Sequence, residues 1–187
     1  MSVRFDIQTT PLKDLNVLTR KLVGDSRGYF ERMFCIDELH NVVANRKIMQ
    51  INHTLTQKKG SVRGMHFQHS PSAEMKIVSC LRGHVFDVAV DLRPGSVTFL
   101  QWHAELLSAN NCKTLAIPEG FAHGFQALTD DCEMIYLHTA AYDSTAEGGL
   151  NPKDPSLAIQ WPLPIAELSA RDAGHPMITQ DFKGVCL

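Results

Sequence analysis

The sequence lacks the features that mark several large classes of protein. Its five cysteines form no Cys-x-x-Cys pair, and their number is odd. Scattered cysteines of this kind are typical of reduced thiols, not of a disulfide framework or a zinc site. The first residues contain no apolar leader segment, and no apolar run approaches the length of a transmembrane helix. We therefore expect a cytoplasmic protein without a membrane partner.

The chain also lacks an excess of either charge. It has 18 Lys and Arg against 20 Asp and Glu, for a formal net charge of −2. No basic field therefore favours nucleic acid as a partner, and any bound anion needs a local cluster of Arg and Lys. With 187 residues the chain is long enough to bury a full hydrophobic core, so we expect one domain over residues 1–187.

Long helical patterns are nearly absent. The clearest helix candidate covers residues 37–42, with Asp37 as its N-cap. We expect strands at residues 75–81, 84–92, 97–107, 112–117, 123–128 and 133–138. Evenly spaced strands separated by Pro, Gly, Asn and Asp predict a sandwich or barrel. Residues 155–164 are expected to cover one end of that barrel.

Two segments narrow the fold prediction. Residues 60–68 (GSVRGMHFQ) and 118–125 (PEGFAHGF) fit the two half-motifs of the cupin barrel, a double-stranded β-helix. In a metal-binding cupin the first half-motif carries His-x-His, but here the second histidine is replaced by Gln68, a poor ligand for Zn²⁺ or Fe²⁺. We predict an all-β, cupin-type jelly roll with short peripheral helices and no metal. The competing hypothesis is a metal-dependent cupin that uses His66, Gln68, Glu74 and His123.

His66 is the main candidate for proton chemistry. A lone histidine on a strand is ordinarily structural, but Arg63 and Lys76 lie near it in the sequence, and cations gathered around one histidine suit a bound anion. Asp172 reads as a turn or helix-start residue, although a distant carboxylate is also what a catalytic histidine needs to fix its tautomer. Tyr136 reads as a core tyrosine on an apolar strand. For Tyr136 the residue pattern alone favours the structural interpretation. It does not bring Asp172 and His66 together.

Ordered matches across nearly the whole chain make it resemble one enzyme family. They cover residues 24–30, 50–53, 60–68, 86–93, 117–125, 159–162 and 168–172. In these segments the chain resembles the dTDP-4-dehydrorhamnose 3,5-epimerases. The resemblance implies a cofactor-independent isomerase that epimerises a nucleotide-diphosphate 4-keto-6-deoxyhexose through an enolate, at C5 and with C3 left open, in deoxysugar biosynthesis. It also implies a homodimer formed through the N-terminal strands.

The same resemblance implies roles for individual residues. His66 matches the base, Asp172 its carboxylate partner, and Tyr136 the acid on the opposite face of the sugar. Lys76 matches a lysine near the developing enolate. The implied substrate-binding residues are Arg27 and Arg63 at the diphosphate, and Phe30, Arg32, Gln50, Asn52, His123, Tyr142 and Arg171 elsewhere. This set of side chains suits the chemistry, because removing a proton beside a ketone needs a base and stabilisation of the enolate oxygen.

Three departures from the family pattern lie at the edges of this machinery. Arg32 stands where a Glu is usual, with Glu31 one position early; Leu137 replaces a Lys; and residues 152–154 (PKD) replace Trp-Asn-Asp. They leave open the nucleoside, the sugar and the number of centres inverted. Thymidine is the default, but a guanidinium at position 32 can donate to N3 of cytosine, which raises a cytidine hypothesis. A single-centre epimerase, a keto-isomerase on the same scaffold and a non-catalytic sugar-binding cupin also stay open as hypotheses.

Overall fold

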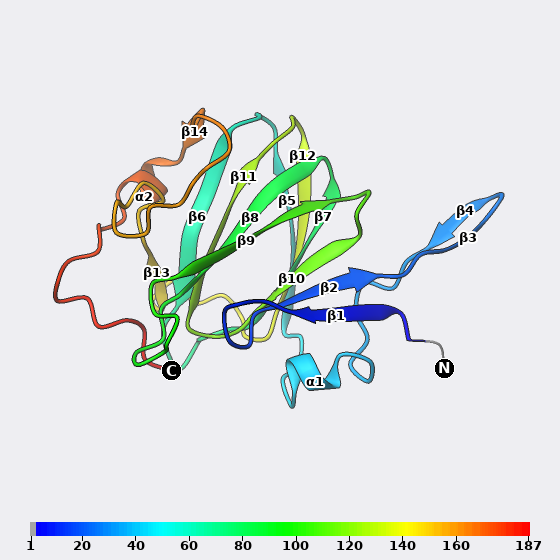
Figure 1. Cartoon of the computed structure of the whole chain (residues 1–187), viewed down its shortest axis with the longest axis horizontal. Coiled ribbons are helices and arrows are strands. Elements are labelled where there is room, and N and C mark those ends of the chain that lie inside the picture. Colours follow the sequence, from blue (N-terminus) through cyan, green and yellow to red (C-terminus); the bar gives the residue numbers. More distant parts are fainter. Residues whose placement is uncertain (1–2) are drawn as a thin grey trace.

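The computed structural model describes residues 3–187, and its body consists of two β-sheets that face each other (Figure 1). The first sheet has the order β1 (Phe5–Thr9), β2 (Asn16–Arg20), β10 (Lys113–Ile117), β7 (Lys76–Arg82), β12 (Cys132–His138), β5 (Gln50–Thr56). The second has the order β13 (Glu147–Gly149), β6 (Ser61–Gln68), β11 (Phe121–Ala127), β8 (His84–Asp91), β9 (Trp102–Ser108), and β14 (Glu167–Leu168) runs parallel to β6. The all-β, cupin-type prediction is confirmed.

The core lies in three layers because the central strands are apolar on both faces. On β8, Val85 and Ala89 face the space between the sheets, whereas Val88 and Val90 face outward. The C-terminal segment covers this outer face, where residues such as Leu157 pack. The prediction that residues 155–164 cover one end of the barrel was wrong, since they cover a sheet face. A strand that is apolar on both sides needs such a cover to keep water from its outer face.

The outer face of the first sheet is covered in the same way by the short helix α1 (His40–Val43) and its flanks. Leu39 and Val43 pack there against residues such as Ile77. The helix begins later than predicted: its N-cap is Leu39, which makes no side-chain cap hydrogen bond, so Asp37 is not the cap. Within residues 3–187 no helix has the length and apolar character to span a membrane.

The strand predictions were accurate to within two residues at every end except one. The strand expected over residues 97–107 begins at Trp102. The reason is local: the carboxylate of Asp91 accepts hydrogen bonds from the hydroxyls of Ser96, at 2.6 Å, and Thr98, at 2.7 Å. These bonds hold the preceding segment as a turn.

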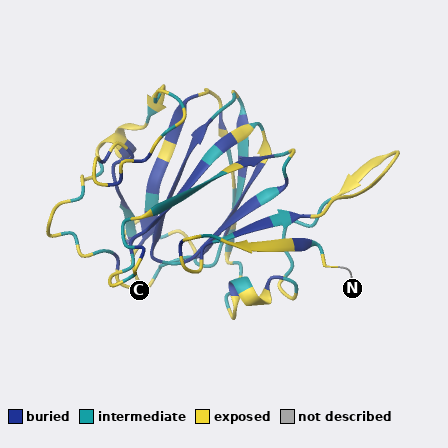
Figure 2. Ribbon diagram, viewed as in Figure 1, coloured by how far each residue is buried: buried dark blue, intermediate teal, exposed yellow. Residues whose placement is uncertain are grey.

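A hairpin that the sequence did not reveal projects from the body. It consists of β3 (Val23–Asp25) and β4 (Gly28–Phe30), and every residue in both strands is exposed (Figure 2). It includes the apolar side chains of Val23, Tyr29 and Phe30. A small exposed hairpin with an apolar surface has no packing partner within residues 3–187, which points to contact with another surface.

Candidate active site

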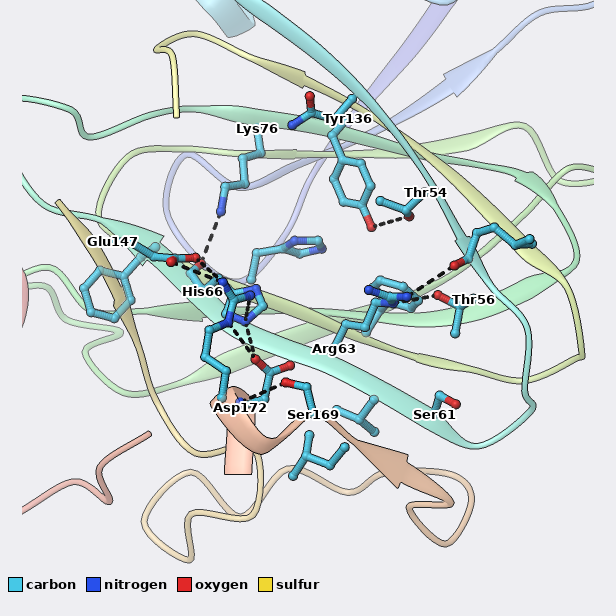
Figure 3. A pocket seen from close by; sticks show the side chains of 18 of the residues that line it. Thr54, Thr56, Ser61, Arg63, His66, Lys76, Tyr136, Glu147, Ser169 and Asp172 are labelled. Carbon is cyan, nitrogen blue, oxygen red and sulfur yellow. Dashed lines mark hydrogen bonds and ion pairs between the residues drawn. The ribbon is translucent and has the colours of Figure 1, made fainter. Parts of the chain in front are cut away.

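One cavity of about 1100 Å³ lies between the two sheets and collects most of the predicted site residues (Figure 3). The predicted residues that line it are His66, Asp172, Tyr136, Lys76, Asn52, Arg63, His123, Tyr142 and Arg171. They come from both sheets and from the C-terminal segment. A concave pocket with convergent polar and titratable groups is the expected form of a small-molecule site.

His66 and the buried Asp172 form a pair at one wall. The helix α2 (Ala170–Ala173) follows β14, and its N-cap Ser169 accepts the backbone N–H of Asp172 at 3.0 Å. Nε2 of His66 lies 2.8 Å from Oδ1 of Asp172, and the N–H of Gly64 donates to Oδ2 at 3.1 Å. Burial alone would raise the pKa of Asp172, but the hydrogen bond and charge of His66 and the Gly64 N–H outweigh it and lower the pKa to about 2.

This pairing sets the tautomer of the histidine. Asp172 is ionised at neutral pH, so it accepts the Nε2 proton of His66. In the neutral ring Nδ1 then carries the lone pair, and it makes no hydrogen bond to any residue of the described chain. His66 therefore presents a proton acceptor whose orientation is fixed by a buried carboxylate.

Tyr136 lies across the cavity from His66, on β12 of the other sheet (Figure 3). Its hydroxyl is 3.4 Å from Oγ1 of Thr54. Burial raises the pKa of Tyr136 above its ordinary value, and the Thr54 contact offsets this only in part. The phenol therefore stays protonated at neutral pH and can donate a proton from the side opposite His66.

Lys76 is held in the same cavity by Glu74. Its Nζ lies 3.2 Å from Oε1 of Glu74 and donates to the backbone oxygen of His66 at 3.3 Å. Oε2 of Glu74 accepts from Nδ1 of His138 at 2.7 Å. Burial would raise the pKa of Glu74, but His138 and Lys76 together lower it. An ionised Glu74 thus anchors an ammonium group where it can stabilise negative charge on a substrate.

His123 belongs to a second buried histidine–carboxylate pair. Its Nε2 lies 2.8 Å from Oδ1 of Asp87, whose other oxygen has no hydrogen-bond partner within residues 3–187. Burial raises the pKa of Asp87. The ring of His123 meets that of Tyr136 edge-on, with centroids 6.1 Å apart. The pair therefore supports the wall on which Tyr136 lies.

The four residues of the metal hypothesis each have a different partner. Gln68 donates to the backbone oxygens of Ser72 and Ala141 and accepts from the N–H of Asp143. Glu74 bonds Lys76 and His138, and His123 bonds Asp87. The Gln68 amide thus already bonds backbone groups, and the ammonium group of Lys76 already neutralises Glu74. This arrangement does not favour the metal-dependent cupin.

Polar contacts also position the residues expected to hold the substrate. Arg63 donates from Nε to Oγ1 of Thr56 at 2.9 Å, and Arg171 lies 3.0 Å from Glu147. Gln50 does not line the cavity, but it bonds the Asn52 side chain and the backbone N–H of Tyr142, each at 3.0 Å. Gln50 therefore orients two residues that do line it.

Besides Gln50, three predicted substrate-binding residues lie outside the cavity of their own chain. Arg27 pairs with Asp25 on the projecting hairpin at 2.6 Å, and Phe30 on the same hairpin is 58% exposed. The guanidinium of Arg32 pairs with Glu38. Within one chain these residues do not join the site, so their roles stay predictions.

Several cavity residues were missed by reasoning from the sequence: Thr54, His138, Glu147 and Ser169. Thr54 follows Asn52 by two positions, and His138 follows Tyr136 by two, on strands where alternate residues share a face. That periodicity was a usable signal. Glu147 and Ser169 carried none, because their contacts depend on the folding of the C-terminal segment.

Comparison with known proteins agrees with this geometry. The family model for dTDP-4-dehydrorhamnose 3,5-epimerase matches residues 9–180. The dTDP-4-dehydrorhamnose 3,5-epimerase of Salmonella typhimurium is 40% identical, over 91% of this chain and 94% of that protein. The dTDP-4-dehydrorhamnose 3-epimerase of Streptomyces niveus is 37% identical, over 83% and 75%.

A solved structure shows the same agreement in three dimensions. The dTDP-6-deoxy-D-glucose-3,5-epimerase of Legionella pneumophila, in complex with dTDP-4-keto-L-rhamnose, superposes with a TM-score of 0.88 at 38% identity, over 92% of each chain. The family-model match over residues 9–180 includes the C-terminal segment that completes the cavity. On these grounds the chain is an epimerase and belongs to the dTDP-4-dehydrorhamnose 3,5-epimerase family.

Proposed function

We propose that the protein epimerises a thymidine-diphosphate 4-keto-6-deoxyhexose at C5 and C3, in deoxysugar biosynthesis. The observation that carries this proposal is the placement of the oriented base His66 and the protonated acid Tyr136 on opposite walls of one cavity. Inversion at a carbon requires one group on each face of the sugar, and this pair supplies both.

The steps balance without a cofactor. Nδ1 of His66 takes the proton from the carbon beside the ketone, and the electron pair of that C–H bond moves to the C4 oxygen as an enolate. The ammonium of Lys76 stabilises the enolate oxygen. Tyr136 then delivers its proton to the opposite face of the same carbon. Solvent removes the proton from His66 and returns one to Tyr136, which resets the enzyme.

A second candidate function differs from the first in the number of carbons that are inverted. C3 and C5 both flank the C4 ketone, so one base and one acid suffice for two inversions if the sugar presents each carbon in turn. The Streptomyces niveus relative is named a 3-epimerase, which favours single-centre inversion as the second candidate. Incubation with the 4-keto sugar in D₂O, followed by NMR, distinguishes them: deuterium at both carbons supports the proposal, and deuterium at one carbon supports single-centre inversion.

His66→Ala tests the assigned base in the same assay. We expect solvent exchange at every reactive carbon to be abolished, because the imidazole that Asp172 orients is then missing. Nucleotide binding should persist, since the phosphates are assigned to the arginines. Exchange at the wild-type rate in His66→Ala would overturn the assignment.

We further propose a homodimer in which the projecting hairpin of one copy reaches the cavity of the other. Exposed apolar side chains on the hairpin (Tyr29 and Phe30) and on the edge strand β5 (Ile51 and Leu55) support such an interface. The family resemblance assigns Arg27 to the diphosphate, yet Arg27 lies outside its own cavity. A second copy would supply it.

Subunit mixing tests this arrangement. His66→Ala and Arg27→Ala should each be inactive alone, but dimers that contain one copy of each have one cavity with both residues present. We expect unfolding and refolding of the mixture to recover a substantial part of the activity. If Arg27 instead serves its own chain, mixing restores nothing.

A further inference from the structure

A third titratable residue, His175, lies beside the His66–Asp172 pair and has no role in the proposed reaction. Its Nε2 is buried, has no hydrogen-bond partner within residues 3–187, and lies 4.0 Å from Oδ1 of Asp172. Gly149 lies against the ring; a Cβ at that position would come within 2.3 Å of Nε2. The ring therefore fits only because position 149 has no side chain. A buried ring nitrogen with no partner is uncommon, and this one is next to a carboxylate.

One ligand atom from each of His66, Asp172 and His175 lies within 4.8 Å of the other two. Zn²⁺ binds histidine nitrogen and carboxylate oxygen at about 2.0–2.2 Å, so in a tetrahedral site its ligand atoms are about 3.3–3.6 Å apart. The separations of 2.8 Å and 4.0 Å at Asp172 lie on either side of this range. A movement of the two imidazole rings toward each other by about 1 Å would complete a three-ligand set.

The ligand types also suit a cation. The ring of His175 meets that of His66 edge-on, with centroids 5.8 Å apart. The other oxygen of Asp172 is already oriented by the N–H of Gly64. Two imidazoles and one carboxylate are ligands that favour Zn²⁺ over Mg²⁺, which prefers an all-oxygen shell.

We propose that His66, Asp172 and His175 form an inhibitory Zn²⁺ site, with the fourth position open to water from the cavity. This site differs from the cupin metal set considered above, since only His66 is common to both. The inhibition part rests on the proposed function of His66 as the base. The binding part rests only on the geometry of the three ligands.

The mechanism of inhibition follows from the single proton of a neutral imidazole. When Zn²⁺ bonds to Nε2 of His66, the proton on that nitrogen moves to Nδ1, with no net release. Nδ1 then loses the lone pair that would accept the substrate proton. The ion also replaces the His66–Asp172 hydrogen bond. Zinc therefore converts the base into a group that cannot remove a proton.

One neighbour opposes the ion. Nη2 of Arg171 lies 3.3 Å from Nε2 of His66, and a guanidinium repels a divalent cation. Nε of Arg171 also lies 3.5 Å from Oδ1 of Asp172. Because the Arg171 side chain is more than half exposed, it can swing into solvent once its contacts to Asp172 and Glu147 break. We therefore expect Arg171→Gln to tighten metal binding. The same change would not raise the metal affinity of an unrelated surface site.

The test measures binding and activity separately. Co²⁺ titration followed by visible absorption reports on the site without any substrate, in a Cys186→Ser background because the exposed thiol of Cys186 would compete. Activity is followed by solvent exchange with added ZnCl₂, MgCl₂ or EDTA. We expect Zn²⁺ to inhibit, Mg²⁺ to have no effect, and EDTA to restore activity.

Substitutions at His175 decide the outcome. His175→Asn should weaken Co²⁺ binding and zinc inhibition together by about tenfold or more, a change of about 1.4 kcal/mol or more. His103→Asn is the matched control, since His103 pairs with Glu105 outside the cavity and should change neither. If His175→Asn folds poorly, His175→Gln replaces it. Absence of Co²⁺ bands in the wild type, or equal affinities in both proteins, would overturn the site; Co²⁺ binding without epimerase activity would count against the proposed function alone.

Discussion

Tyr136→Phe separates the two halves of the proposed reaction. The change deletes only the phenol oxygen, whose one hydrogen bond, to Thr54 at 3.4 Å, is long. Its loss should cost no more than about 1 kcal/mol of the free energy of unfolding, or about 4 °C in Tm for a domain of this size. The fold and the His66–Asp172 pair on the opposite wall should therefore remain intact.

The effect on catalysis should be far larger than that on stability. Without the phenol no positioned acid delivers a proton to the second face, and general acid catalysis contributes about 10²–10⁴-fold. This corresponds to about 3–5 kcal/mol in the barrier to inversion. His66 can still remove a proton and return deuterium to the same face. The ratio of exchange to inversion should therefore rise by about 10²–10⁴.

The assay follows deuterium incorporation and configuration at C3 and C5 by NMR, in D₂O, for the wild type and the variant. Thr54→Val is the matched control: it removes the same hydrogen bond but keeps the phenol, so the ratio should stay at the wild-type value. If exchange and inversion fall equally in Tyr136→Phe, then Tyr136 acts in binding or packing, and the assignment of the acid is wrong.

Three further predictions concern other residues. Asp172→Asn should lower kcat by about 10²-fold or more with little change in KM, because one amide oxygen cannot accept from both His66 and Gly64; single-turnover kinetics check this. At Asp91, burial would raise the pKa, but hydrogen bonds from Arg93, Ser96 and Thr98 lower it from 3.8 to about 2. Above pH 4 this carboxylate should therefore add about 2 kcal/mol to the free energy of unfolding, and this contribution is lost as the pH falls towards 2. Urea unfolding should show that Asp91→Asn removes this part of the pH slope, and an unchanged slope would contradict it. In competition binding, dTDP should displace a bound nucleotide at lower concentration than CDP, because Glu38 occupies the Arg32 guanidinium that could otherwise donate to cytosine. A preference for CDP would support the cytidine hypothesis instead.

The strands of the two sheets could be predicted from the sequence because their determinants are local. Short apolar runs and the Pro, Gly, Asn and Asp residues that separate them are properties of short segments. They placed most strand ends within two residues. The exception, at residues 97–101, shows the limit: Asp91 lies several residues away, and its buried carboxylate accepts the hydroxyls that turn the chain.

The tautomer and orientation of His66 could not be read from its own segment. Asp172 follows it by 106 residues and reaches it only because β14 pairs with β6 and brings α2 against that strand. The family resemblance supplied the pairing as an expectation. The physical cause is the short parallel pairing of β14 with β6, which no local sequence pattern predicts.

His175 and the hairpin show what tertiary structure alone decided. The sequence marks His175 as one histidine among nine, and its position against Gly149 and Asp172 follows from how the C-terminal segment packs on β6 and β13. Arg27 and Phe30 read as site residues by resemblance, yet the chain folds them onto a hairpin away from its own cavity. Residue types and their strand faces were thus determined by the sequence itself, whereas the neighbours of each side chain depended on long-range packing, since contacts between distant segments form only when the whole core closes.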